Sequence, residues 1–147
     1  MKIAVFVSGG GTNLQAIIDN TKVGILKDIE ISLVLSSSSG AYALTRASDN
    51  NLRSVVINAK DYATRDEWDL AVLHAVEESG AELIVLAGYL SLIGPRTVRE
   101  YSNRIINIHP ALIPSFCGAG MYGIKPHEAA LERGVKVSGA TEHFVND

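Results

Sequence analysis

The stretch KIAVFVSGGGTN occupies residues 2–13 and decides the fold class. Residues 2–8 are almost uniformly apolar and β-branched, which is typical of a strand buried on both faces of a parallel sheet. Glycines then turn the chain, and apolar residues recur at helical spacing over residues 13–20, with Thr12 or Asn13 as the expected helix cap. A buried strand, a glycine turn and a helix make up the first unit of an α/β fold.

The rest of the chain continues this alternation of strands and helices. Further strands are expected at residues 29–35, 54–58, 83–87, 105–108 and 138–145, and further helices at 41–50, 64–79, 95–101 and 126–133. The pattern predicts a doubly wound, mostly parallel sheet with helices on both faces, in which ligands bind beyond the carboxyl ends of the strands. Residues 114–126 are rich in glycine and lack periodicity, so we expect a long surface loop there.

Composition restricts the class of protein. The chain has 147 residues, of which 47% are hydrophobic, and this fits a single domain over residues 1–147. A net charge of -3 gives no basic surface for nucleic acid or an anionic membrane. The longest apolar run, residues 83–87, is far shorter than the ~20 residues of a transmembrane helix. With one cysteine, Cys117, and no histidines paired at metal-ligand spacing, we expect a cytoplasmic protein that binds no metal.

The glycine turn at residues 8–13 has two interpretations. Backbone amides in such a turn, at the start of a helix, bind phosphate groups well. The turn lacks the third glycine of the dinucleotide fingerprint and the lysine of a P-loop. The sequence therefore predicts either a site for a phosphate monoester or a plain connection between a strand and a helix.

Asn107 and His109 lie two residues apart at the end of a predicted strand. Strand alternation places both on the same face. An amide there can stabilise an oxyanion while an imidazole moves a proton near neutral pH. The alternative is a histidine with a purely structural role. On the last predicted strand, His143 shares a face with Thr141, and we expect it to be a buried supporting residue.

Four segments of the chain resemble the phosphoribosylglycinamide formyltransferases, which are folate-dependent enzymes of purine synthesis. They read VFVSGGGTNLQAIID (5–19), LIVLAGYLSLI (83–93), IINIHPALIPSF (105–116) and HEAALERGVKVSGATEHFV (127–145). The resemblance implies a Rossmann-like formyltransferase fold and formyl transfer from 10-formyltetrahydrofolate to the amine of 5-phosphoribosylglycinamide, by a monomer or a homodimer. A formyltetrahydrofolate hydrolase and a phosphate-binding module without catalysis are the alternatives.

The resemblance also implies roles for individual residues. It places the substrate phosphate at Gly11, Thr12 and Asn13. It places the folate at Arg65, Leu90, Ser91, Leu92, Ile93, Asn107, Asn146 and Asp147. In catalysis, Asn107 would stabilise the oxyanion and His109 would donate a proton to the folate nitrogen, with Thr141 and His143 as supporting residues. The peptide bond before Pro114 is expected to be cis.

The chain departs from the family pattern at several places. Ser91 stands where arginine is common, Glu142 stands where an apolar residue is usual, and a short insertion lies around residues 118–124. The family's catalytic aspartate falls shortly beyond Asp147, in an Asp-Gly-Gly motif. We therefore expect the sequence to be cut short at its carboxyl end and the chain alone to be impaired as an enzyme.

Overall fold

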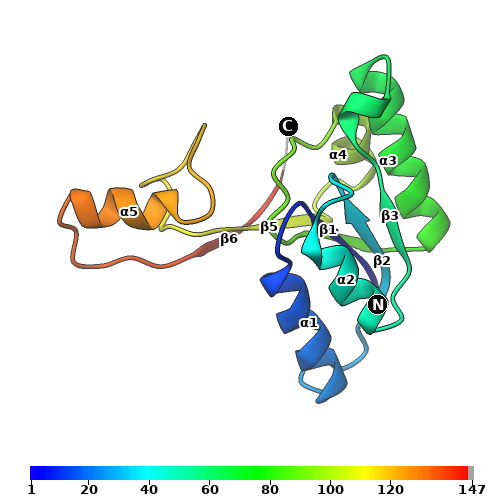
Figure 1. Cartoon of the computed structure of the whole chain (residues 1–147), viewed down its shortest axis with the longest axis horizontal. Helices are drawn as coiled ribbons and strands as arrows, with labels where there is room; N and C mark the ends of the chain where they lie inside the picture. Colours follow the sequence, from blue (N-terminus) through cyan, green and yellow to red (C-terminus); the bar gives the residue numbers. More distant parts are fainter. Residues whose placement is uncertain (146–147) are drawn as a thin grey trace.

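The computed structural model describes residues 1–145, which form one sheet in the order β3-β2-β1-β4-β5-β6 (Figure 1). The strands are β1 (Lys2–Val7), β2 (Glu30–Ser36), β3 (Ser54–Val56), β4 (Leu83–Leu86), β5 (Ile105–His109) and β6 (Thr141–Phe144). All neighbours are parallel except β6, which is antiparallel to β5. The predicted mostly parallel, doubly wound sheet is confirmed, and its strand order reverses between β1 and β4.

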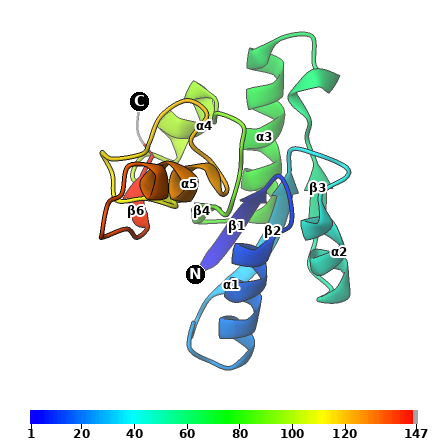
Figure 2. The ribbon, with the colours of Figure 1, turned by 60° about the vertical axis from the view of Figure 1, so that its left-hand side comes forward.

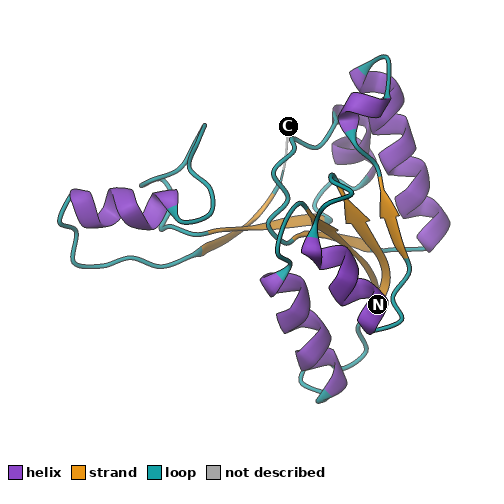
Figure 3. Cartoon of the chain, viewed as in Figure 1, coloured by secondary structure: helices purple, strands orange, loops and turns teal. Residues whose placement is uncertain are grey.

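Helices cover both faces of this sheet (Figure 3). They are α1 (Thr12–Lys22), α2 (Tyr42–Asp49), α3 (Arg65–Ser79), α4 (Pro95–Glu100) and α5 (Lys125–Glu132), with a short 3₁₀ helix at Ala59–Asp61. Helices α1 and α2 pack on one face, and α3 and α4 pack on the other. Within residues 1–145, none of the helices combines the length and the apolar character needed to cross a membrane.

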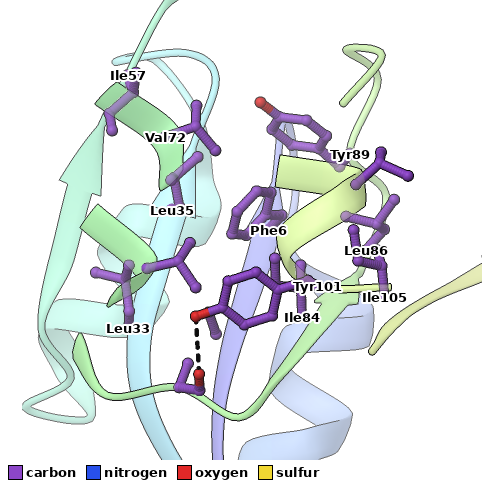
Figure 4. Close-up of a cluster of buried hydrophobic side chains, with 14 of the residues drawn as sticks. Phe6, Leu33, Leu35, Ile57, Val72, Ile84, Leu86, Tyr89, Tyr101 and Ile105 are labelled. Atoms are coloured by element: carbon purple, nitrogen blue, oxygen red, sulfur yellow. Dashed lines mark hydrogen bonds between the residues drawn. The ribbon is translucent and has the colours of Figure 1, made fainter. Parts of the chain in front are cut away.

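An apolar core lies on each face of the sheet, and successive residues of β1 point alternately into the two cores. Phe6 points to the α3 side, whereas Val5 and Val7 point to the α1 side, and all three are fully buried. Figure 4 shows Phe6 at the centre of the α3-side cluster, where its ring meets the ring of Tyr89 edge-on with centroids 5.2 Å apart. Apolar residues on both faces are what a strand in the middle of a covered parallel sheet requires.

Helix α1 begins differently from the prediction. Gly11, and neither Thr12 nor Asn13, is the N-cap residue, and no side chain caps the helix. Gly11 has a φ of 71°, and a Cβ there would lie 2.6 Å from the Cβ of Ala43 on α2. Only glycine fits this position, because the left-handed conformation and the close approach of α2 both exclude a side chain.

Two predicted strands are shorter in the structure. The third ends at Val56 and not at residue 58, because the side chain of Asn58 instead accepts a hydrogen bond from the amide of Lys60 and caps the 3₁₀ helix. The last covers Thr141–Phe144 and not residues 138–145, because pairing with β5 starts only at His109 opposite Thr141. The other elements differ from the prediction by one or two residues at their ends.

Residues 110–140, which we call the arm, connect β5 to β6 and carry α5. The arm extends away from the remaining described residues, which we call the body (Figure 1), and Figure 2 turns it toward the viewer. Of the arm's residues, all of which the structure describes, only Ala111, Pro126 and Ala130 are buried. The arm is therefore held mainly by its two ends in the sheet.

Candidate functional site

A cavity of about 820 Å³ lies at the carboxyl ends of the central strands. Its walls come from four segments of the chain: the start of α1, the loop after β4, the end of β5, and the arm. The lining residues include Asn13, Leu90, Leu92, Asn107, His109 and residues 118–123. This is the edge at which a doubly wound sheet binds its ligands, next to the reversal of strand order.

Asn107 is oriented by His143 across the β5–β6 pair. The two residues are direct partners in the antiparallel register, and Asn107 Nδ2 lies 3.1 Å from His143 Nε2. An amide nitrogen can only donate, so His143 Nε2 accepts, and the other ring nitrogen, Nδ1, lies 3.1 Å from the carbonyl oxygen of Phe144. With the Asn107 amide in this orientation, Nδ1 is the ring nitrogen that donates to the Phe144 carbonyl. His143 holds one amide proton of Asn107 and leaves the second available to the cavity.

His109 is fixed by the arm. Its Nε2 lies 2.9 Å from the carbonyl oxygen of Phe116. Because a carbonyl only accepts, this nitrogen carries a proton whether the ring is neutral or charged. The contact sets the orientation of the imidazole at the cavity wall without fixing its charge.

Thr141 links the strand pair to the turn that follows His109. Its hydroxyl donates to the carbonyl of Ala111 at 2.6 Å and accepts from the amide of Ile113 at 3.0 Å. The peptide bond between Ile113 and Pro114 is cis, as the resemblance implied. Thr141 and His143 thus lie beside His109 and Asn107 on the neighbouring strand. His143 is only half-buried there, so the prediction of a buried residue was wrong, because β6 lies at the edge of the sheet.

The glycine turn reaches the cavity through Asn13. Gly11 and Thr12 directly precede it and do not line the cavity. The first amides of a helix have no acceptor within the helix, so the start of α1 presents donors at this edge of the sheet. Ser8, the first residue of the predicted turn, joins it to the loop after β4: its hydroxyl accepts from the amide of Leu90 at 2.9 Å, a contact that the sequence did not predict.

The segment of residues 90–93 is divided between the cavity and the core. Leu90 and Leu92 line the cavity with exposed side chains, whereas Ile93 packs against the α3-side core. Arg65 does not line the cavity. Its guanidinium donates to the carbonyl of Leu92 at 2.9 Å and lies 4.3 Å above the ring of Trp68. Ser91 does not line the cavity either.

Tyr89 is a buried residue of the cavity wall that the sequence reasoning missed. Within the described residues its hydroxyl has no hydrogen-bond partner. Burial raises the pKa of Tyr89 to about 12, and the opposing influences of nearby Ser91 and of the Arg65 charge are smaller. The position of Tyr89 in the loop that follows a buried strand was a signal that could have identified it.

The arm also supplies residues that the sequence did not assign to the site. The loop predicted only as a surface segment lines the cavity through residues 118–123, within the apparent insertion. Glu142, the other noted departure, lines a smaller cavity of about 220 Å³ together with residues of α1, β4 and β5. Asn146 and Asp147 lie outside the described residues. Over residues 1–145, no group of three or more His, Cys, Asp or Glu side chains is arranged to hold a metal ion.

Fold and site together define an α/β protein with a ligand-sized cavity at the switch point of a doubly wound sheet. The chain belongs to the formyl transferase family, whose model, described as "Formyl transferase", matches residues 1–147. The predicted family resemblance is thereby confirmed.

Individual relatives agree with this family. A phosphoribosylglycinamide formyltransferase of Haemophilus influenzae is 37% identical over 99% of this chain and 66% of its own length. The trifunctional purine biosynthetic protein adenosine-3 of Gallus gallus is 42% identical over 99% of this chain and 14% of its own length. The crystal structure of glycinamide ribonucleotide transformylase 1 from Symbiobacterium toebii matches with a TM-score of 0.91 and 37% identity, over 99% of this chain and 66% of that one. The chain therefore spans only part of the length of each of these relatives.

Proposed function

We propose that the protein carrying this chain transfers the formyl group of 10-formyltetrahydrofolate to the amine of 5-phosphoribosylglycinamide. The observation that carries the proposal is the pair Asn107 and His109, held on one cavity wall by His143, Thr141 and the Phe116 carbonyl. The names of the similar proteins support this reaction, since they include phosphoribosylglycinamide formyltransferases.

In this reaction the amine attacks the formyl carbon, and the carbonyl electrons move to oxygen. The free amide proton of Asn107 is suited to stabilise that oxyanion, because His143 already fixes the orientation of the amide. The bond from the formyl carbon to the folate nitrogen then breaks. We assign the proton that this nitrogen gains to His109, and the amine loses one proton in exchange.

The phosphate of the substrate is assigned to the turn at Gly11, Thr12 and Asn13. Support comes from the start of α1, where backbone donors and the helix dipole favour an anion. Asn13 lies on the wall of the same cavity as Asn107 and His109. A single ligand can therefore reach from the turn to the catalytic pair.

The folate is assigned to the other end of the cavity, along residues 90–93. Leu90 and Leu92 offer exposed apolar side chains to a flat ring system, and Arg65 supports this segment by donating to the carbonyl of Leu92. The proposal also includes Ser91, Ile93, Asn107, Asn146 and Asp147 as folate contacts. We further propose a cytoplasmic protein that acts as a monomer or a homodimer, although a similar protein of Arabidopsis thaliana is named chloroplastic.

The test is an assay of the protein that carries this chain, with both substrates supplied. We expect tetrahydrofolate and the formylated amine to appear in equal amounts. Sulfate or the substrate phosphate should be found at Gly11–Asn13 in a liganded crystal. Formate released without formylated amine would overturn the proposal and indicate a hydrolase, and binding of the phosphorylated substrate with no turnover would indicate a binding module.

A further inference from the structure

The carbonyl groups of the three glycines in the glycine turn all accept hydrogen bonds. The carbonyl of Gly9 accepts from the amide of Ala43 at 3.0 Å, and that of Gly11 accepts from the amide of Gln15 at 2.9 Å. The carbonyl of Gly10 accepts from Nε of Arg46 at 2.8 Å. Helices α1 and α2 therefore hold three consecutive carbonyl oxygens.

Arg46 is the one side chain among these three donors. It is half-buried on α2, and its Nη1 donates to the side-chain oxygen of Gln15 at 3.0 Å. Its guanidinium also lies 5.1 Å from the centre of the Tyr42 ring. These contacts fix the planar group between α2 and the glycine turn, with the geometry that an arginine fork provides and a lysine does not.

The charge of Arg46 is not neutralised by a neighbouring acid. Over residues 1–145, the ion pairs are Lys2–Glu30, Arg53–Glu78 and Arg96–Asp66, so no acidic side chain pairs with Arg46. A positive charge beside the turn lowers the energy of an anion bound there, and the interaction is stronger at a half-buried site than in bulk water. The same side chain thus holds a carbonyl dipole away from the ligand and adds a favourable charge.

We propose that Arg46 is a positioning residue for the substrate phosphate, acting through the carbonyl of Gly10. The inference rests on the proposed function, because it takes the turn at Gly11–Asn13 as the phosphate site. With Arg46 in place, the carbonyl of Gly10 is turned toward α2 and the amides that follow remain free to face the phosphate. Without it, the Gly10 peptide is free to rotate and present its oxygen to the anion.

The experiment compares Arg46→Met and Arg46→Lys with the unmodified protein, using substrate with and without its 5-phosphate. Arg46→Met should raise KM for the phosphorylated substrate about 10- to 100-fold, the size expected for losing a charge-assisted hydrogen bond. It should change kcat and the KM for the formyl folate less than about threefold. Arg46→Lys keeps the charge but loses the fork, so its KM should lie between the other two.

Arg53→Met is the matched control, because Arg53 is an exposed arginine beyond the carboxyl end of α2, paired with Glu78. It should leave all kinetic constants unchanged. The dephosphorylated substrate should bind equally well to all four proteins. If Arg46→Met weakens binding of both forms of substrate equally, or of the folate as much as the phosphorylated substrate, Arg46 has only a structural role. If the unmodified protein shows no preference for the phosphorylated substrate, the phosphate site itself is wrong and the inference falls with it.

Discussion

The body and the arm contribute to the same cavity but are held in place by different means. In the body, an apolar core packs on each face of the sheet, and β1 is buried from Ile3 to Val7. In the arm, large apolar side chains are exposed, among them Ile124 at 67%, Leu131 at 79% and Val137 at 74%. The arm instead depends on the β5–β6 pair and on the hydrogen bonds of Thr141.

The body and the arm therefore contribute differently to the stability of the fold and to the proposed reaction. The body supplies most of the buried apolar area and therefore most of the hydrophobic stabilisation. The proposed catalytic pair lies where the two regions meet, and the Phe116 carbonyl that orients His109 belongs to the arm. Substitutions in the body should change the free energy of unfolding, whereas those at the junction should change the rate of reaction.

The largest expected effect is on the reaction rate, for a substitution of His109, which lies where the body meets the arm. His109→Ala should lower the rate of formyl transfer by roughly 10²–10⁴-fold, because the general acid is lost. The thermal midpoint should stay nearly unchanged, since the ring is only partly buried. His74→Ala, at an exposed position of α3, is the control and should retain full activity. Turnover close to normal in His109→Ala would remove the proposed mechanism.

The next largest effect is expected on the free energy of unfolding, when a buried side chain of the body is compared with an exposed one of the arm. Phe6→Ala should lower the free energy of unfolding by about 3–5 kcal/mol, because it leaves a cavity at the centre of the body's core. Leu131→Ala in the arm should change it by less than about 0.5 kcal/mol, because that side chain is exposed. Urea denaturation measures both. A loss above about 2 kcal/mol for Leu131→Ala would show that the arm is packed in solution and would remove the contrast between the two regions.

A buried carboxylate joins two helices within the body. Asp69 on α3 accepts from the amide of Arg96 at 2.8 Å and from the hydroxyl of Thr97 at 2.6 Å, at the start of α4. Asp69→Ala should therefore lower the free energy of unfolding by about 1–3 kcal/mol, because buried donors lose their acceptor. Asp66→Ala, which removes an exposed partner of Arg96, should leave the denaturation midpoint almost unchanged. Equal losses in the two variants would contradict a special role for the buried carboxylate.

Two tyrosines of the body give the smallest effects and differ from each other. The hydroxyl of Tyr101 donates to the carbonyl of Ala81 at 3.0 Å (Figure 4), whereas that of Tyr89 has no partner within the described residues. Tyr101→Phe should lower the free energy of unfolding by about 1 kcal/mol. Tyr89→Phe should leave it unchanged or slightly higher at neutral pH, and a clear loss would reveal a partner for the Tyr89 hydroxyl.

The free energy of unfolding at alkaline pH also tests the burial of Tyr89. Burial raises the pKa of Tyr89 from 10.0 to about 12, so above pH 10 the unfolded chain loses this proton while the folded chain keeps it. The stabilisation is complete below pH 10 and is lost as the pH rises toward 12. Tyr89→Phe should make the decline of stability over this range shallower. The pKa of Tyr101 is also raised by burial, so part of the decline should remain in that variant.

The local sequence was sufficient to predict the strands and helices and which of their side chains share a face. The apolar run at residues 2–8 predicts a strand buried on both sides, and β1 lies in the centre of the sheet with helices on each face. The two-residue spacing of Asn107 and His109 predicts a shared face, and both line the cavity. Such patterns depend only on the periodicity of the backbone, so they can be recognised before any long-range contact is known.

Contacts between distant segments could not be predicted in this way. No local pattern indicates that Arg46 reaches the carbonyl of Gly10, that Ser8 binds the amide of Leu90, or that the hydroxyl of Tyr89 is left without a partner among the described residues. The predicted helix cap was wrong for a related reason: Thr12 and Asn13 are good capping residues, but the approach of α2 selects Gly11 instead.

Periodicity and local propensity thus determined the strands, the helices and the shared face of Asn107 and His109. The depth of burial and the partner of each polar group were decided by how the helices pack on the sheet. Both depend on residues far apart in the chain, as the contact between Arg46 and the Gly10 carbonyl shows across 36 positions of sequence.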